Sequence, residues 1–257
     1  MLEINGYEIH IANDLDTRLK IYSMLFHEYF KKGYAKNNKS EYWFSKYNLQ
    51  HNTITIYIKK KDIILNTVTI VCRGEYGLPC EEIFKEEVEM LINNGHTIVE
   101  TISLSNFETK EKLAFEFLLI ITLLVSYSYY NASFNVATIN PRHLTYYSKY
   151  LNYNKLGETK NFQKVNNAPA DFVYLKNSVF FEKIRCSKLF NNTFNNYELF
   201  EKFQNSLSKF IENNHAKLTE SDVEKLLNIA TEPAMSEFEY NKLQNEIIKG
   251  VEFPIVN

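Results

Sequence analysis

Glu100 is the acidic residue whose surroundings most clearly suggest chemistry. Apolar residues alternate around it, and the pattern predicts a strand in which Glu100 shares one face with Ile98, Ile102 and Leu104. A carboxylate on an apolar face costs free energy unless it is paired or used. Burial raises a carboxyl pKa, so Glu100 is a candidate to take a proton from an ammonium group. The alternative is an ordinary strand residue that points to solvent.

Arginines are the second group of interest, because only four occur among the 29 lysines and arginines. Arg18, in the first predicted helix, is a candidate to pair with Glu100 or to bind a substrate carboxylate bidentately. A place on the helix surface is the alternative. Arg142 is a candidate to bind substrate or to meet acidic groups of a protein partner. For His143, beside it, three roles are open: an acid, a base, or a polar contact within its helical turn.

A strand that leads directly into a helix is predicted to position these last two side chains. The strand covers Phe134 to Ile139, Asn140 caps the helix, and Pro141 takes the first helical position. Tyr147 lies on the apolar face of this helix. Asn152 follows where a left-handed residue ends a helix.

The remaining pattern gives the fold class. Helices are predicted at 16–34, 82–91 and 110–130, and strands at 53–59, 63–72, 97–104, 155–159 and 170–176. Helices that alternate with strands after a first hairpin imply a mixed sheet, an α/β or α+β architecture. We therefore expect one domain over 1–176, with helices flanking its sheet.

The last third of the sequence contains helical patterns alone. Leu199, Phe203 and Phe210 predict one helix, and capping boxes at 221–224 and 236–239 open two more, the last ending at Gly250. We expect residues 177–257 to form a helical extension that packs on the preceding domain.

Composition limits the location and the partners. A net charge of −2 favours no nucleic acid. Three cysteines without paired spacing, and histidines without a helper acid, predict neither a disulfide framework nor a metal site. The start resembles no signal peptide, and the apolar run 117–130 is shorter than the roughly 20 residues of a membrane span. We expect a cytoplasmic protein without a transmembrane segment.

The helix that begins at Asn140 resembles the late part of the GCN5-related N-acetyltransferase (GNAT) fold. In that fold a tyrosine faces the thioester, and a Gly-Phe pair ends the helix; here Tyr147 and the pair Asn152-Tyr153 take those places. The resemblance implies acyl transfer, with Tyr147 protonating the leaving thiolate. Simple packing of Tyr147 between Leu144 and Leu151 is the alternative.

Further motifs resemble the long-chain N-acyl amino acid synthases of the FeeM type, which are GNAT-fold relatives of the acyl-homoserine-lactone synthases. The motifs occur in one order and include Arg18 to Tyr34, Gly77-Leu-Pro to Glu87, Glu100-Thr-Ile-Ser-Leu104, Pro141-Arg-His143 and Asn166-Asn-Ala-Pro-Ala-Asp171. The resemblance covers roughly 16–176. The segment 103–111 lacks the glycines with which ordinary GNAT enzymes bind the coenzyme A pyrophosphate.

The resemblance implies transfer of a long-chain fatty acyl group to the α-amine of an amino acid. The donor would be acyl carrier protein, carrying the acyl group as a phosphopantetheine thioester, with acyl-coenzyme A as the alternative. No tightly bound cofactor is implied, and a lipid product allows membrane association. Glu100 matches the glutamate that both synthase branches share, and we expect Ser103 and Leu104 to contact substrate.

Three other functions are compatible with the sequence. Lactone synthases have an arginine three residues after the glutamate, and Ser103 takes that position here, which counts against the lactone-synthase alternative. The related exosortase-associated acyltransferases are the second alternative. The third is a non-catalytic GNAT-like module whose helical extension binds a protein partner.

Overall fold

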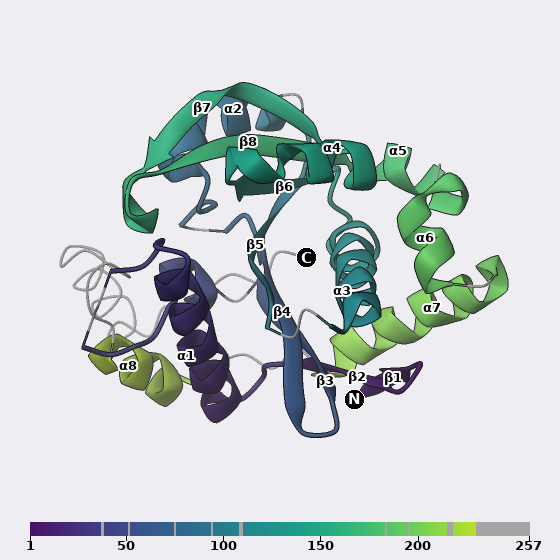
Figure 1. The fold of residues 1–257 in the computed structure, drawn as a ribbon, viewed down its shortest axis with the longest axis horizontal. Coiled ribbons are helices and arrows are strands. Elements are labelled where there is room, and N and C mark those ends of the chain that lie inside the picture. Colours follow the sequence, from purple (N-terminus) through teal and green to yellow (C-terminus); the bar gives the residue numbers. More distant parts are fainter. Residues whose placement is uncertain are drawn as a thin grey trace.

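An eight-stranded mixed sheet forms the centre of the fold in the computed structural model (Figure 1). The structure describes residues 1–36, 39–50, 52–74, 76–93, 95–107, 110–182, 184–194, 196–214 and 218–229. The strands are β1 (Leu2–Ile4), β2 (Tyr7–Ile11), β3 (Thr53–Lys60), β4 (Ile63–Cys72), β5 (Ile98–Asn106), β6 (Phe134–Ile139), β7 (Asn154–Phe162) and β8 (Ala168–Lys176). Their order is β1-β2-β3-β4-β5-β6-β8-β7, and β5 and β6 are the parallel neighbours. The predicted mixed sheet with flanking helices is confirmed.

The first hairpin, β1–β2, is the part of the sheet that the sequence analysis missed. It extends the sheet beyond β3, with Ile9 opposite Ile58. Its turn is Asn5-Gly6, in which both residues have positive φ (51° and 76°). Asn-Gly between short apolar runs is a strong hairpin signal, so the sequence did contain the information.

Helices cover both faces of the sheet. Helices α1 (Leu15–Lys31) and α2 (Glu81–Ile92) lie on one face. Helix α3 (Lys112–Leu124) lies on the other face, against Ile54, Ile56 and Ile58 of β3, and continues as a π-helical turn, Val125–Tyr129. By length and composition alone Lys112–Tyr129 could cross a membrane, but most of it is buried inside this fold, as expected for a core helix.

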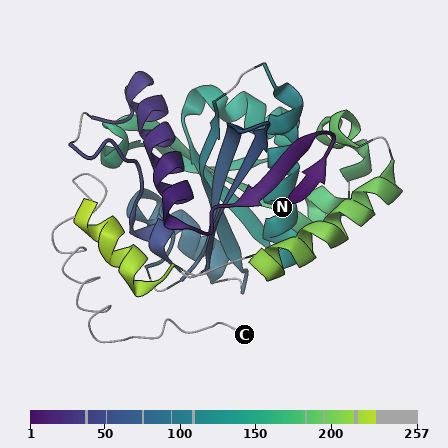
Figure 2. The same ribbon diagram turned by 90° about the horizontal axis from the view of Figure 1, so that it is seen from below.

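The C-terminal helices divide between the two faces. Helices α5 (Asn177–Glu182), α6 (Lys188–Thr193) and α7 (Tyr197–Asn214) share the hydrophobic core of α3, where the rings of Phe117 and Phe194 lie 5.8 Å apart. Helix α8 (Glu220–Ile229) shares a core with α1 on the opposite side (Figure 2). It begins with a capping box between Thr219 and Asp222, two residues before the predicted one. The predicted helix from 236 to 250 lies outside the described residues.

The parallel strands β5 and β6 separate after three paired residues. Ile98 pairs with Phe134, Val99 with Asn135 and Glu100 with Val136, and the pairing ends there. Both strands continue, β5 to Asn106 and β6 to Ile139. The sheet therefore opens at Glu100, and backbone groups beyond it on the two facing edges are available to a ligand.

A β-bulge in β5 accompanies this opening. Thr67 of β4 pairs with Ser105 and Thr69 pairs with Ile102, so β5 contains one extra residue. Ser103 in the bulge has φ +52°, a left-handed conformation. The bulge corrects one expectation: Ile98 and Ile102 pack in the core around α2, whereas Leu104 packs against the core around α3. A bulge shifts the alternation of side chains, so Leu104 does not share the face of Glu100 as the strict pattern predicted.

Candidate active site

A pocket of about 350 Å³ lies where β5 and β6 separate. Its floor is formed by Glu100 to Leu104 of β5 and Ala137 to Ile139 of β6. The walls come from the end of α1, the loop that follows it, the turn after β6 and the β7–β8 hairpin. Aromatic side chains dominate these walls and include Tyr29, Tyr34, Tyr42, Trp43, Phe44, Tyr47, Tyr147 and Phe162. The pocket is therefore largely apolar, as small-molecule sites usually are.

Glu100 is the carboxylate at the inner end of this pocket. Its side chain is 1 % exposed. Oε2 accepts a hydrogen bond from the backbone N–H of Cys80 at 2.8 Å, and Oε1 accepts one from Oγ1 of Thr138 at 3.3 Å. Burial raises the pKa of Glu100 to about 7, against the hydrogen bonds from Cys80 and Thr138, which lower it. Near neutral pH, Glu100 therefore exists in both the protonated and the ionised form and is able to accept a proton.

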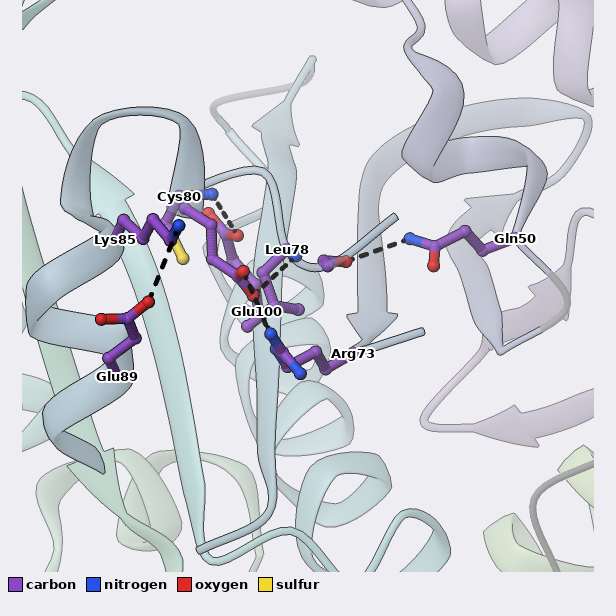
Figure 3. Close-up of polar contacts among 9 residues, drawn as sticks. Gln50, Arg73, Leu78, Cys80, Lys85, Glu89 and Glu100 are labelled. Atoms are coloured by element: carbon purple, nitrogen blue, oxygen red, sulfur yellow. Dashed lines mark hydrogen bonds and ion pairs between the residues drawn. The ribbon is translucent and has the colours of Figure 1, made fainter. Parts of the chain in front are cut away.

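The loop before α2 holds the Cys80 backbone in place (Figure 3). Glu81 connects two parts of this loop: its Oε1 accepts hydrogen bonds from Nε of Arg73 at 2.7 Å and from the backbone N–H of Leu78 at 3.1 Å. The amide of Gln50 donates to the carbonyl of Gly77 at 3.3 Å. These contacts fix the loop, and the loop in turn fixes the backbone N–H of Cys80 that donates to Glu100.

Arg142 and His143 lie in the turn η3 (Pro141–His143), where β6 leads into α4 (Leu144–Leu151), and both line the pocket. The predicted cap is confirmed, because the side chain of Asn140 accepts a hydrogen bond from the backbone N–H of Arg142 at 3.2 Å. Nε of Arg142 donates to Nε2 of His143 at 3.1 Å. Burial lowers the pKa of His143, and the positive charges of Arg142 and Lys32 lower it further.

Tyr147, Ser103 and Leu104 also line the pocket. Burial raises the pKa of Tyr147, which keeps its phenol protonated. Its ring packs edge-on against Tyr153 at 5.3 Å, so Tyr147 is at once a pocket residue and a core residue. Asn152, with φ +62°, ends the helix as predicted.

Arg18 lies away from the other candidates and does not line the pocket. It is buried, and its guanidinium donates to the carbonyl of Ala12 at 2.8 Å and to the carbonyl of Asn48 at 3.2 Å. Asn48 itself lines the pocket, so Arg18 supports the loop that forms one wall.

Sequence reasoning missed two contributors to the site. Nothing in the sequence distinguished Thr138 from other strand residues. It reaches Glu100 because it lies on β6 just beyond the end of the β5–β6 pairing. The wall formed by Tyr42, Trp43 and Phe44 carried a signal in its run of three aromatic residues, but the run fits a core equally well.

Comparisons with known proteins agree with this geometry. A family model described as N-acyl amino acid synthase FeeM matches residues 20–176. The solved structure of FeeM, an N-acyl amino acid synthase from uncultured soil microbes, has a TM-score of 0.58 at 21 % identity, over 67 % of this chain and 92 % of FeeM. BjaI, described as a CoA-dependent acyl-homoserine lactone synthase, has a TM-score of 0.51 at 9 % identity, over 70 % of this chain and 90 % of BjaI. No curated protein sequence matches.

A mixed sheet that opens at one parallel pair, together with the likeness to the FeeM structure, gives the protein a GNAT-like fold. The chain belongs to the FeeM family of N-acyl amino acid synthases, which is related in fold to the acyl-homoserine lactone synthases.

Proposed function

We propose that this protein transfers a long-chain fatty acyl group from acyl carrier protein to the α-amine of an amino acid. The observation that carries the proposal is the position of Glu100, whose pKa is about 7 and which lies at the inner end of an aromatic-lined pocket between separated strands. A carboxylate of that pKa is suited to deprotonate an ammonium group at neutral pH.

The reaction needs three events at the pocket. The acceptor arrives as an ammonium ion, and Glu100 takes one proton from it, directly or through a water molecule. The amine nitrogen then forms a bond to the thioester carbonyl carbon and loses its second proton. The carbon–sulfur bond breaks, and the leaving thiolate takes up one proton to become the carrier thiol, while the proton held by Glu100 passes to solvent.

Two other parts of the pocket support these events. The pairing of β5 with β6 ends at Glu100. Backbone groups of β5 beyond Glu100 are therefore available to the thioester carbonyl. Tyr147 has a protonated phenol in the pocket and is suited to donate a hydrogen bond to the leaving sulfur. Because its pKa is raised, Tyr147 is a weak acid and acts mainly through that hydrogen bond.

The start of α3 supports a carrier protein over coenzyme A as the donor. Ordinary GNAT enzymes bind the pyrophosphate at the corresponding helix N-terminus. Here Glu111 precedes α3, and its carboxylate accepts from the hydroxyl of Tyr7 at 2.6 Å and forms an ion pair with Lys60 at 3.0 Å. A carboxylate at that position opposes a second anion, and a carrier protein keeps its phosphate farther from the helix.

Product analysis tests the proposal. The full chain is incubated with palmitoyl-loaded acyl carrier protein, or with palmitoyl-coenzyme A, and each proteinogenic amino acid in turn. We expect an N-palmitoyl amino acid by mass spectrometry, one free thiol for each product, and preference for the carrier-protein donor. Failure to acylate any amino acid with either donor would refute the proposal, and product from coenzyme A alone would refute the carrier protein as donor.

A further inference from the structure

We propose that Arg142 binds the α-carboxylate of the amino-acid acceptor, a role that rests on the proposed function. The sequence offered Arg18 for this task, but the guanidinium of Arg18 hydrogen-bonds two backbone carbonyls outside the pocket lining. Arg142 lies at the exposed edge of the pocket, in the turn after β6. Three observations carry the inference: the charges in the pocket, the orientation of the guanidinium, and its relation to Glu100.

Charge pairing distinguishes Arg142 from the other cations of the pocket. Three lysine or arginine side chains line it among the described residues: Lys32, Arg142 and Lys164. Nζ of Lys164 lies 2.6 Å from Oε1 of Glu82, and Nζ of Lys32 lies 3.2 Å from Oε2 of Glu28. Among the ion pairs of the part of the chain that the structure describes, none includes Arg142. Arg142 is thus the pocket cation whose charge is left for a ligand.

The neighbours of Arg142 orient its guanidinium. Nε donates to Nε2 of His143 at 3.1 Å, and the guanidinium carbon lies 5.6 Å from the ring centroid of Tyr34. A neutral imidazole is required to accept that bond, and the lowered pKa of His143 favours the neutral form. With Nε engaged by His143, the two terminal nitrogens remain as a pair of donors without a protein acceptor among the described residues. A pair of parallel N–H donors is the arrangement that a carboxylate accepts bidentately.

The position of Arg142 along the chain relates it to the proton acceptor. Thr138, which donates a hydrogen bond to Glu100, lies in β6, and Arg142 lies four positions later, in the turn that follows this strand. Their Cα atoms are therefore at most about 14 Å apart. An amino acid carries its amine and its carboxylate on one carbon atom. Arg142 and Glu100 line the same pocket, so an acceptor whose carboxylate binds Arg142 at the edge can direct its amine inward, toward Glu100.

The experiment compares ligands that keep one of the two polar groups. For the best amino-acid acceptor, the deaminated acid and the decarboxylated amine serve as competitive inhibitors; for phenylalanine these are 3-phenylpropanoate and phenethylamine. Arg142→Gln is compared with Arg142→Lys and with Lys149→Gln, which removes an exposed cation of α4 outside the pocket lining. Circular dichroism and thermal melting verify that each variant is folded.

We expect Arg142→Gln to raise the KM of the amino acid and the inhibition constant of the deaminated acid about 10- to 100-fold, the scale of one or two charge-assisted hydrogen bonds. The inhibition constant of the decarboxylated amine and the KM of the acyl donor should stay unchanged. Arg142→Lys should fall between, and Lys149→Gln should behave as wild type.

Two results would overturn the inference. An equal loss for acid and amine would mean that Arg142 shapes the pocket without reading the carboxylate, and a raised KM for loaded carrier protein alone would mean that Arg142 meets the donor. Both leave the proposed function intact. A wild-type protein that acylates only amines without a carboxylate would overturn both proposals together.

Discussion

The backbone N–H of Cys80 donates a hydrogen bond to Oε2 of Glu100 at 2.8 Å, although 20 positions separate the two residues. The thiol of Cys80 also hydrogen-bonds this carboxyl group and, like the backbone bond, lowers the pKa of Glu100. Without these bonds, burial would push the pKa of Glu100 still higher. Burial thus has the largest effect on the pKa of Glu100, and the loop before α2 lowers the raised value.

The pH dependence of acyl transfer should report this group. Below a pKa of about 7, Glu100 is protonated and unable to accept a proton. We expect kcat/KM to rise about tenfold per pH unit up to about 7 and then to level off. Initial rates from pH 5 to 8.5 at low acceptor concentration measure this, with the free acceptor titrated separately. A rate independent of pH across that range would argue against Glu100 as the base.

Glu100→Gln should abolish most activity and yet stabilise the fold at alkaline pH. The pKa of Glu100 is raised in the folded state, so the folded protein binds more protons than the unfolded chain between pH 4.5 and about 7. Stability is therefore lost as pH rises through this window, by about 3 kcal/mol in total for ionising the buried carboxyl group. Glutamine cannot ionise and avoids that loss.

Thermal melting of both proteins at pH 5 and pH 8 checks this second effect. The melting temperature of Glu100→Gln should exceed that of wild type by several degrees at pH 8 and by much less at pH 5. Activity should fall by about 10²- to 10⁴-fold, the usual contribution of a general base. Equal melting temperatures at pH 8 would contradict the burial of an ionising group at this position.

Cys80→Ala should shift the pH profile without removing activity. The variant loses the thiol donor but keeps the backbone N–H, so the pKa of Glu100 should rise. One weak hydrogen bond corresponds to a shift of about 0.3 to 1 pH unit. The acidic limb of the profile should move upward by that amount while the plateau rate is retained. Cys72→Ala is the control, because it removes a half-buried thiol that does not line the pocket.

Glu111→Gln should make acyl-coenzyme A a better donor. The variant removes the negative charge that precedes α3 but leaves an acceptor for the hydroxyl of Tyr7. We expect the KM for palmitoyl-coenzyme A to fall by about 2- to 5-fold, the scale of one screened charge interaction, while the KM for loaded carrier protein is unchanged. An equal change for both donors would remove the electrostatic argument for the carrier protein.

The sequence predicts the sheet class well because local signals and burial agree there. The alternating isoleucines lie in β3, as predicted. Asn140 and Pro141 begin the helical turn after β6, and the left-handed Asn152 ends α4, where the sequence indicated. Glu100 could be singled out because one carboxylate interrupts an apolar face. These features depend on neighbours within a few positions of the sequence.

The rest of the site depends on contacts between distant segments. The bulge at Ser103 requires a left-handed serine, for which no residue pattern gave a signal, and it moved Leu104 to the other face. Arg18 and Arg142 were both candidates to bind substrate, and only the fold shows that Arg142 lines the pocket whereas Arg18 is buried against the carbonyls of Ala12 and Asn48. Leu199 was one of three residues that predicted its helix but is 39 % exposed, whereas Phe200 and Phe203 are buried.

Gly77→Ala tests whether the loop before α2 sets the reactivity of Glu100. Gly77 has φ +72°, and a Cβ there would lie 2.9 Å from Oε2 of Glu81, the residue that fixes this loop. Gly95 provides a matched control, since it has φ +75° and open space around the position of a Cβ. Both substitutions force a left-handed alanine and should each cost about 1 kcal/mol of stability.

Of the two substitutions, Gly77→Ala alone makes the Glu81 carboxylate shift, and we expect this to loosen its bond to Leu78 in the loop that positions the backbone N–H of Cys80. Activity should therefore fall several-fold or more in Gly77→Ala, and the acidic limb of its pH profile should move upward, because Glu100 loses a donor that lowers its pKa. Gly95→Ala should keep the wild-type profile despite a similar loss in melting temperature. Identical pH profiles for the two variants would show that the loop supports the fold without tuning the carboxylate.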